Sequence, residues 1–168
     1  YEDQGEEATV AEEAVDETQI PVLYHHYRLG TLKLRLRDRR VLHVPGPVTV
    51  AWFHLPEGGT LPVWINNETR LLYGLLPWFA DNLPPSGGLV TVRRREGPGH
   101  DFELSCAGEV DADTYIAPEL LESLLTLRQR LLRRRAFLLE IVTELLAASR
   151  GLSFDQLWAR ANVLRRVT

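Results

Sequence analysis

The residues of this chain best suited to chemistry are arginines, which supply 18 of its 19 basic side chains. A guanidinium group can pair with a phosphate through two parallel hydrogen bonds, and neutralising phosphates releases counterions from a nucleic acid. We take three groups of bases as candidate nucleic-acid contacts: Lys33, Arg35 and Arg37; Arg93, Arg94 and Arg95; and Arg133, Arg134, Arg135, Arg160, Arg165 and Arg166. The alternative is structural, since the outer face of a strand is polar and cations suit helix C-termini. An arginine-rich composition alone would also give many such residues.

The side chains that could serve catalysis lack partners at useful spacings. We expect the histidines at 25, 26, 43 and 54 in strands, where neighbours point to opposite faces, and no metal-binding spacing joins them. Cys106 ends a predicted strand, and no motif links it to a histidine or an acid. The glycine pairs at 58–59 and 87–88 lack the context of a phosphate-binding loop. We therefore expect no catalytic residue, no metal, no cofactor and a non-enzymatic role.

Composition limits the class of protein further. The chain has 168 residues, of which 45% are hydrophobic, enough for one good core or two small ones. It has no apolar run of the length of a membrane span, so we expect no membrane partner. The single cysteine excludes a disulfide framework within the chain, and the cytoplasm is the natural expectation for its location.

Charge is distributed unevenly along the chain. Residues 1–20 hold eight acids and no base, so the remainder carries 19 bases against 15 acids. Residues 128–166 hold nine arginines against three acids. Low hydrophobicity and one sign of charge predict that residues 1–20 are a flexible acidic tail or linker.

Residues 21–112 read as a β-rich domain. Leu32, Leu34 and Leu36 alternate with basic residues, which indicates a half-buried strand, and Pro-Gly clusters mark turns. The predicted strands cover 22–29, 32–37, 40–44, 48–54, 61–65, 89–95 and 100–106, the last two forming a hairpin. Asn66 and Asn67 are good N-caps for a helix over 68–81. The expected architecture is a small sheet or barrel with one short helix.

Residues 113–168 change to helical spacing. Pro118 suits a first helical position, and the leucines that follow predict a helix over 118–132 with a broad apolar face. A second helix is predicted over 135–149, with Phe137, Leu138, Ile141, Val142, Leu145 and Leu146 inward. Ser153 and Gln156 form a capping-box pattern that predicts a third helix, with Phe154 and Trp158 in the core.

The segment 136–146, AFLLEIVTELL, followed by 151–158, GLSFDQLW, resembles the opening of winged-helix domains of the HARE-type helix-turn-helix group of bacterial proteins. The resemblance implies a long first helix, a Gly turn and a short capped second helix, ahead of a recognition helix and a β-wing. Only the first two helices, within 136–168, are matched. The order strand, helix, Pro/Gly break and hairpin over 48–106 is also similar to B3-type DNA-binding pseudobarrels.

These observations together predict an α+β chain: an acidic tail, a β-rich domain at 21–112 and a helical segment at 113–168. The chain starts at Tyr1, contains no Met and stops within the winged-helix pattern, so we expect a piece of a larger bacterial protein. The expected function is a nucleic-acid-associated module, with duplex DNA as the partner. The alternative is a protein-interaction module, dimeric or bound to another protein through the Leu-rich helix 118–132. Its second basis is an aromatic group: Trp52, Phe53, Trp64, Tyr73, Trp78 and Phe79.

Overall fold

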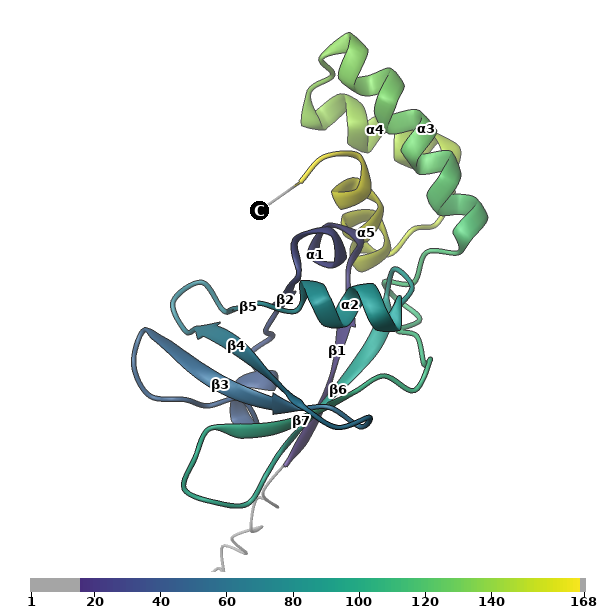
Figure 1. Ribbon diagram of the computed structural model, residues 1–168. Coiled ribbons are helices and arrows are strands. Elements are labelled where there is room, and N and C mark those ends of the chain that lie inside the picture. Colours follow the sequence, from purple (N-terminus) through teal and green to yellow (C-terminus); the bar gives the residue numbers. More distant parts are fainter. Residues whose placement is uncertain (1–15, 167–168) are drawn as a thin grey trace, which may run out of the picture.

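The structure, a computed structural model that describes residues 16–166, is α+β, as the sequence predicts. A seven-stranded sheet forms one end of the molecule and three helices form the other (Figure 1). The strands are β1 (Glu17–Val22), β2 (Thr31–Lys33), β3 (Val48–His54), β4 (Thr60–Asn66), β5 (Leu71–Tyr73), β6 (Gly88–Arg94) and β7 (Asp101–Ser105). The helices are α1 (Tyr24–Leu29), α2 (Leu76–Asn82), α3 (Pro118–Arg134), α4 (Leu138–Ala148) and α5 (Phe154–Leu164), with a 3₁₀ turn η1 (Asp38–Arg40).

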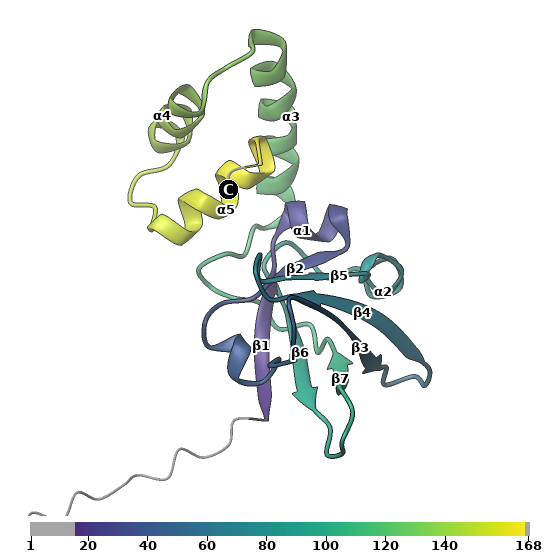
Figure 2. The ribbon, with the colours of Figure 1, turned by 90° about the vertical axis from the view of Figure 1, so that its left-hand side faces the viewer.

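The sheet curls into a nearly closed barrel. Its strand order is β1-β6-β7-β3-β4-β5-β2, and every neighbouring pair is antiparallel except β3 and β7. The edge strands β1 and β2 follow each other in the chain and are joined only by α1 and two flanking residues. In both ribbon views α1 lies between the barrel and α5 (Figures 1 and 2).

Alternating side chains fill the barrel. Each long strand turns every second residue inward, so that Ile20, Phe53, Ile65, Val92 and Phe102 are fully buried. The rings of Phe53 and Phe102 stack across the parallel pair with centroids 5.2 Å apart. This interior is one apolar cluster that takes residues from every strand.

A second apolar cluster holds the helical segment to the barrel. Leu124 and Leu131 of α3, Ile141 and Leu145 of α4, and Val163 and Leu164 of α5 are buried in it. Leu23, which precedes α1, is buried in the same cluster. The second core is therefore built from both ends of the chain. Among the described residues, no helix is long and apolar enough to cross a bilayer.

The prediction of a strand over 22–29 is wrong, because this stretch ends β1 and then forms α1. Gly30 closes the helix in the left-handed conformation, with φ of 65°. A Cβ at Gly30 would lie 2.6 Å from the backbone nitrogen of Leu76, so the turn also needs glycine for space. A six-residue helix is too short to show a helical period, which is why its aromatic and histidine run resembled a strand.

The strand predicted over 32–37 is present only at its start, as β2, and the strand predicted over 40–44 is absent from the sheet. Strand β2 stops at Lys33, Leu34 stays buried, and Leu36 is 70% exposed. The chain then turns through η1, because the Asp38 carboxylate accepts a hydrogen bond from the Arg35 backbone N–H at 2.7 Å. Residues 41–44 pack apolar side chains inward without joining the sheet.

The helix predicted over 68–81 is replaced by a turn, strand β5 and the shorter helix α2. The Asn66 carboxamide does cap the turn, accepting hydrogen bonds from the N–H groups of Glu68 and Thr69 at 3.0 and 2.9 Å. Arg70 then takes a left-handed conformation with φ of 56°, which reverses the chain into β5. Pro77 lies at the start of α2, where its missing N–H costs nothing.

The remaining predictions are largely confirmed, with three corrections. Strands at 48–54 and 61–65, the hairpin, the helix from Pro118 and the Ser153 capping box are all present.

Strand β1 begins at Glu17, inside the predicted acidic tail, while residues 1–15 lie outside the described residues. Phe137, Leu138 and Leu146 are exposed on α4 instead of inward. Phe154 is 78% exposed instead of belonging to the core.

Candidate functional site

The first predicted basic group does not form one face. Lys33 ends β2, and its ammonium group donates a hydrogen bond to the carbonyl of Thr69 at 2.8 Å. Arg35 is held by Asp38, and only Arg37 is exposed on the surface. Because β2 ends before Arg35, the three side chains do not share the face of one strand.

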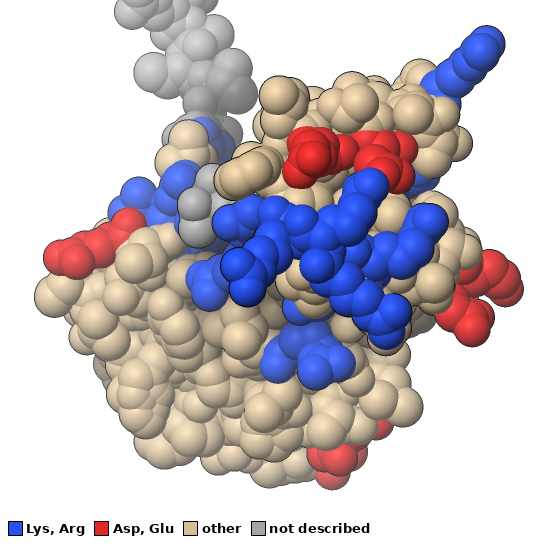
Figure 3. All heavy atoms as spheres, turned by 90° about the horizontal axis from the view of Figure 1, so that it is seen from above, with Lys and Arg blue, Asp and Glu red and all other residues tan. Residues whose placement is uncertain are grey.

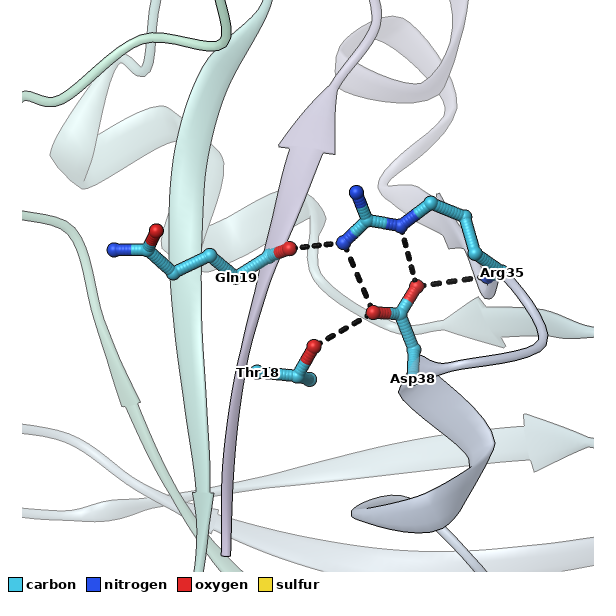
Figure 4. A network of polar contacts seen from close by, with 4 residues as sticks. All are labelled: Thr18, Gln19, Arg35 and Asp38. Atoms are coloured by element: carbon cyan, nitrogen blue, oxygen red, sulfur yellow. Dashed lines mark hydrogen bonds and ion pairs between the residues drawn. The ribbon is translucent and has the colours of Figure 1, made fainter. Parts of the chain in front are cut away.

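Arg35 belongs to a cluster of polar contacts that closes the open side of the barrel (Figure 4). Its Nε donates to Asp38 Oδ2 at 2.8 Å and its Nη2 donates to Asp38 Oδ1 at 2.9 Å. The guanidinium group also donates to the carbonyl of Gln19, and the Thr18 hydroxyl donates to Asp38 at 2.6 Å. Asp38 is fully buried, so this cluster ties β1 to the segment after β2 and gives Arg35 a structural role.

The second predicted group, on the hairpin, is mostly occupied as well. Arg93 pairs with Glu17 across the β1–β6 ladder at 2.7 Å. Arg94 donates to the carbonyls of Val41 and His43 at 2.7 and 2.6 Å, and its guanidinium carbon lies 5.0 Å from the centre of the Phe102 ring. Arg94 thereby satisfies the backbone of the non-sheet segment 41–44. Arg93 and Arg95 are both exposed, Arg93 with its ion pair to Glu17.

The third predicted group lies at the helical end of the molecule. Figure 3 shows Lys and Arg side chains gathered over this end, with acidic side chains along one border. Arg133, Arg134 and Arg135 end α3, and Arg165 and Arg166 follow α5. Arg134 pairs with Glu144 at 2.8 Å. Arg160 is partly buried and donates to the Ser149 hydroxyl at 2.9 Å, so it belongs to the helical packing.

One cavity between the barrel and the helices carries mixed charge. It measures about 610 Å³, and its lining contains three bases, Lys33, Arg35 and Arg37. The lining also contains three acids, Asp111, Asp113 and Asp155. The acids offset the charge of the bases, so this cavity is a poor site for a polyanion.

A second cavity, of about 400 Å³, is predominantly basic. Lys33 at the end of β2, Arg70 before β5 and Arg166 after α5 all line it, together with His25, Trp158 and Glu68. His25, His26 and Arg70 were not among the predicted site residues. The local sequence carries no signal for them, because its pattern predicts the histidines on a strand and Arg70 on a helix.

The two histidines beside this second cavity are held neutral. Burial, followed by the positive charge of Arg166, lowers the pKa of His25 to about 4. Burial also lowers the pKa of His26 to about 3, with further contributions from His25, Arg166 and Lys33. The two rings lie 4.0 Å apart, and the His26 Nδ1 is 2.7 Å from the Thr31 hydroxyl oxygen. Two adjacent histidines on a helix thus line a cavity, which the predicted strand would not allow.

Two groups of exposed apolar side chains are of interest as possible contact surfaces. On the outer face of the sheet, Trp64 lies opposite Tyr73 in the β4–β5 register, and Trp52 is one strand away on β3. On the helical segment, Phe137 and Leu139 are each 76% exposed at the start of α4. The Leu-rich helix α3 instead buries much of its apolar face in the second core.

Comparison with known proteins gives no family for this chain. No protein-family profile and no curated protein matches it in sequence. Among solved structures, a hypothetical protein of Arabidopsis thaliana is similar, with a TM-score of 0.44 and 13% sequence identity. That alignment covers 55% of this chain and 90% of the plant protein.

Proposed function

We propose that this chain is a non-enzymatic module that contacts a nucleic acid, with duplex DNA as the partner, through its helical end. The support is the gathering of basic side chains over that end in Figure 3. We call the arginine face the following set: Arg130, Arg133, Arg134 and Arg135 of the α3 C-terminus, and Arg165 after α5.

The arginine face differs from the other basic groups in how its side chains are engaged. No hydrogen bond or ion pair with another described residue holds the side chains of Arg130, Arg133, Arg135 or Arg165, and all four are exposed. By contrast, Arg35, Arg93 and Arg94 are each bonded to a carboxylate or to backbone carbonyls. Unpaired guanidinium groups can exchange water for phosphate oxygens without first breaking an internal pair.

The position of this face agrees with the resemblance of residues 136–158 to a winged-helix opening, which stays a prediction. Helix α4 and the first turn of α5 fall within that stretch, and the capped start of α5 follows the expected turn. Arginines near the ends of such helices would contact the phosphate backbone. Contacts of this kind position a protein on duplex DNA and carry no sequence information of their own.

The test is the binding of a fluorescent DNA duplex at several salt concentrations. We expect the double variant Arg133→Gln/Arg135→Gln to weaken binding and to reduce the slope of log K against log salt by about 2, because each lost phosphate contact removes about 0.9 from it. The double variant Arg93→Gln/Arg95→Gln removes the same charge from the hairpin and should leave the slope unchanged. Equal losses in both variants would contradict the assignment to the arginine face. An affinity that does not depend on salt would contradict nucleic-acid binding altogether.

A second candidate function is a protein-interaction module, which the exposed apolar residues favour. Large apolar patches on a protein surface mark sites where another surface packs. Phe137 and Leu139 on α4, and Trp52, Trp64 and Tyr73 on the sheet, are the residues that such a partner would cover.

A further inference from the structure

Three basic side chains that form no ion pair with a described residue line the 400 Å³ cavity described above, which we call the basic pocket. Its cations come from three segments far apart in the chain: Lys33, Arg70 and Arg166. No ion pair joins any of the three to a carboxylate of the described residues. Glu68 is the one acid in the lining, and it is exposed. Like charges held close together repel one another, so the empty pocket has unfavourable electrostatics that an anion would relieve.

The cations act on each other and on the histidines beside them. The pKa of Lys33 is lowered by burial and then by the charge of Arg70. Arg166 lowers the pKa of both His25 and His26, and Lys33 lowers that of His26. These effects indicate that the three charges lie close together.

His25 lines the pocket and carries an unpaired polar atom. Its Nδ1 is buried and has no partner among the described residues. Buried polar atoms are nearly always paired, so this nitrogen is an exception beside the pocket. A neutral imidazole can donate one hydrogen bond through its protonated nitrogen.

The backbone fixes one of the cations in place. Arg70 has a φ of 56°, a left-handed conformation that is unfavourable for a residue with a Cβ. The Asn66 carboxamide holds the turn before it, and the Arg70 carbonyl accepts a hydrogen bond from the Leu34 N–H at 2.9 Å. Strain of this kind persists where the surroundings determine the conformation, and it often marks functional sites.

We propose that the basic pocket binds a phosphate group, held by the Lys33 ammonium and by the guanidinium groups of Arg70 and Arg166, with His25 as a neutral hydrogen-bond donor. Trp158 lies at the wall beside His25, with ring centroids 6.2 Å apart, so a flat group attached to the phosphate would have an apolar surface to contact. This site is distinct from the arginine face, and it stands whether or not that face binds duplex DNA.

Titration calorimetry of the whole chain with inorganic phosphate at neutral pH and low salt tests the proposal. We expect saturable binding that weakens at least about tenfold in Arg70→Gln and in Arg166→Gln, since each removes a charge-assisted contact. The matched control is Arg28→Gln, which removes an exposed arginine of α1 that does not line the pocket. Absence of saturable phosphate binding, or an equal loss in the control, would overturn the proposal.

A second measurement needs no variant, so it does not depend on whether the substituted chains fold. In the unaltered chain, NMR titration of the imidazole C–H signals should show the pKa of His25 and His26 rising when phosphate is bound, because the anion offsets the nearby cations. Chloride at the same ionic strength should leave both pKa values unchanged. Equal effects of chloride and phosphate would count against a specific site.

The source of the phosphate is distinguished by two dinucleotides. If a 5′-phosphorylated dinucleotide binds and its unphosphorylated counterpart does not, the pocket takes a terminal or free phosphate monoester. If both bind equally, the pocket takes the diester of a nucleic-acid backbone. Either result supports the site. Duplex binding by Arg70→Gln, measured separately, reports on the arginine face, so the two proposals can fail independently.

Discussion

His25 and His26 stay neutral because burial removes water from their rings and because the charge of Arg166, and for His26 also that of Lys33, opposes a second positive charge nearby. An imidazole normally gains a proton near pH 6.5, so a neutral pair at lower pH requires that the folded protein resists protonation. The unfolded chain has no such resistance. The difference couples the protonation of this pair to the stability of the whole fold.

The direction of the pH effect follows from the lowered pKa values. Both histidines have a folded pKa below the unfolded value of 6.5, so their contribution to stability is complete above pH 6.5 and is lost as the pH falls toward about 4. We expect the free energy of unfolding to fall between pH 6.5 and 5 by at most about 1.4 kcal/mol for each histidine and pH unit. Urea unfolding at several pH values measures this fall.

Variants distinguish the contribution of the two histidines to this pH dependence from the contribution of other titrating groups. His25→Gln/His26→Asn should flatten the dependence between pH 6.5 and 5, whereas His43→Gln, at an exposed position, should keep it. An equally steep fall in the double variant would mean that other groups control acid stability.

At the scale of elements, the burial of side chains along α4 is uneven. Ile141 is 2% exposed and packs in the second core, whereas Leu139, two residues earlier, is 76% exposed. An amphipathic helix buries the stripe that faces its neighbours, and on α4 this stripe is narrow. Its apolar outer side is a suitable surface for a partner.

Substitutions on the two sides of α4 should therefore differ in their effect on the free energy of unfolding. Ile141→Ala should reduce the free energy of unfolding by about 2–4 kcal/mol, because it leaves a cavity in the second core. Leu139→Gln should leave the stability within about 0.5 kcal/mol, as surface changes usually do. If α4 is an interface, Leu139→Gln should also abolish self-association or partner binding in light scattering. A large loss of stability in Leu139→Gln would show that the exposed side contributes to the fold.

The elements also separate what the sequence can predict from what it cannot. The β6–β7 hairpin, α3 and the capped start of α5 depend on local signals: turn residues, a first-position proline and the Ser153–Gln156 box. Helix α1 and the non-sheet segment 41–44 depend on distant partners, such as Leu76 beside Gly30 and Arg94 beneath the Val41 carbonyl. Such partners are invisible to a local pattern.

The same division applies to the candidate sites. Lys33 and Arg166 stand out in the sequence as bases, but nothing local indicates that they meet Arg70 across a cavity. The sequence likewise marks Arg35 and Arg94 as surface cations. The partners that engage them, Asp38 and the carbonyl of Val41, are supplied by the folded chain.

At the scale of the whole molecule, the segment between barrel and helices is fixed by backbone contacts. The Gly87 N–H donates to the Val22 carbonyl at 2.7 Å, and the Gly87 carbonyl accepts from the Asp111 N–H at 2.8 Å. Gly87 has a φ of 82°, and a Cβ there would lie 2.4 Å from the Cα of Tyr115. The segment 111–116 is thus packed closely against the barrel.

Gly87→Ala should consequently destabilise the chain far more than the same change elsewhere. The matched control is Gly58→Ala, at a φ of 96° with no atom within 4 Å of the added carbon. The control should cost about 1–2 kcal/mol from the backbone alone, and Gly87→Ala should cost about 1–3 kcal/mol more from the clash. Thermal unfolding of both variants measures the difference. Equal costs would indicate that the 111–116 segment can move away from Gly87.

The burial of Leu23 beside Val163 and Leu164 in the second core has a consequence for synthesis of the protein. A ribosome releases Leu23 long before it has made α5, so this leucine must wait in water, or against a chaperone, while more than a hundred further residues are added. The barrel can close around its own interior in the meantime. The second core is complete only when α5 reaches back to a side chain that was made more than a hundred residues earlier.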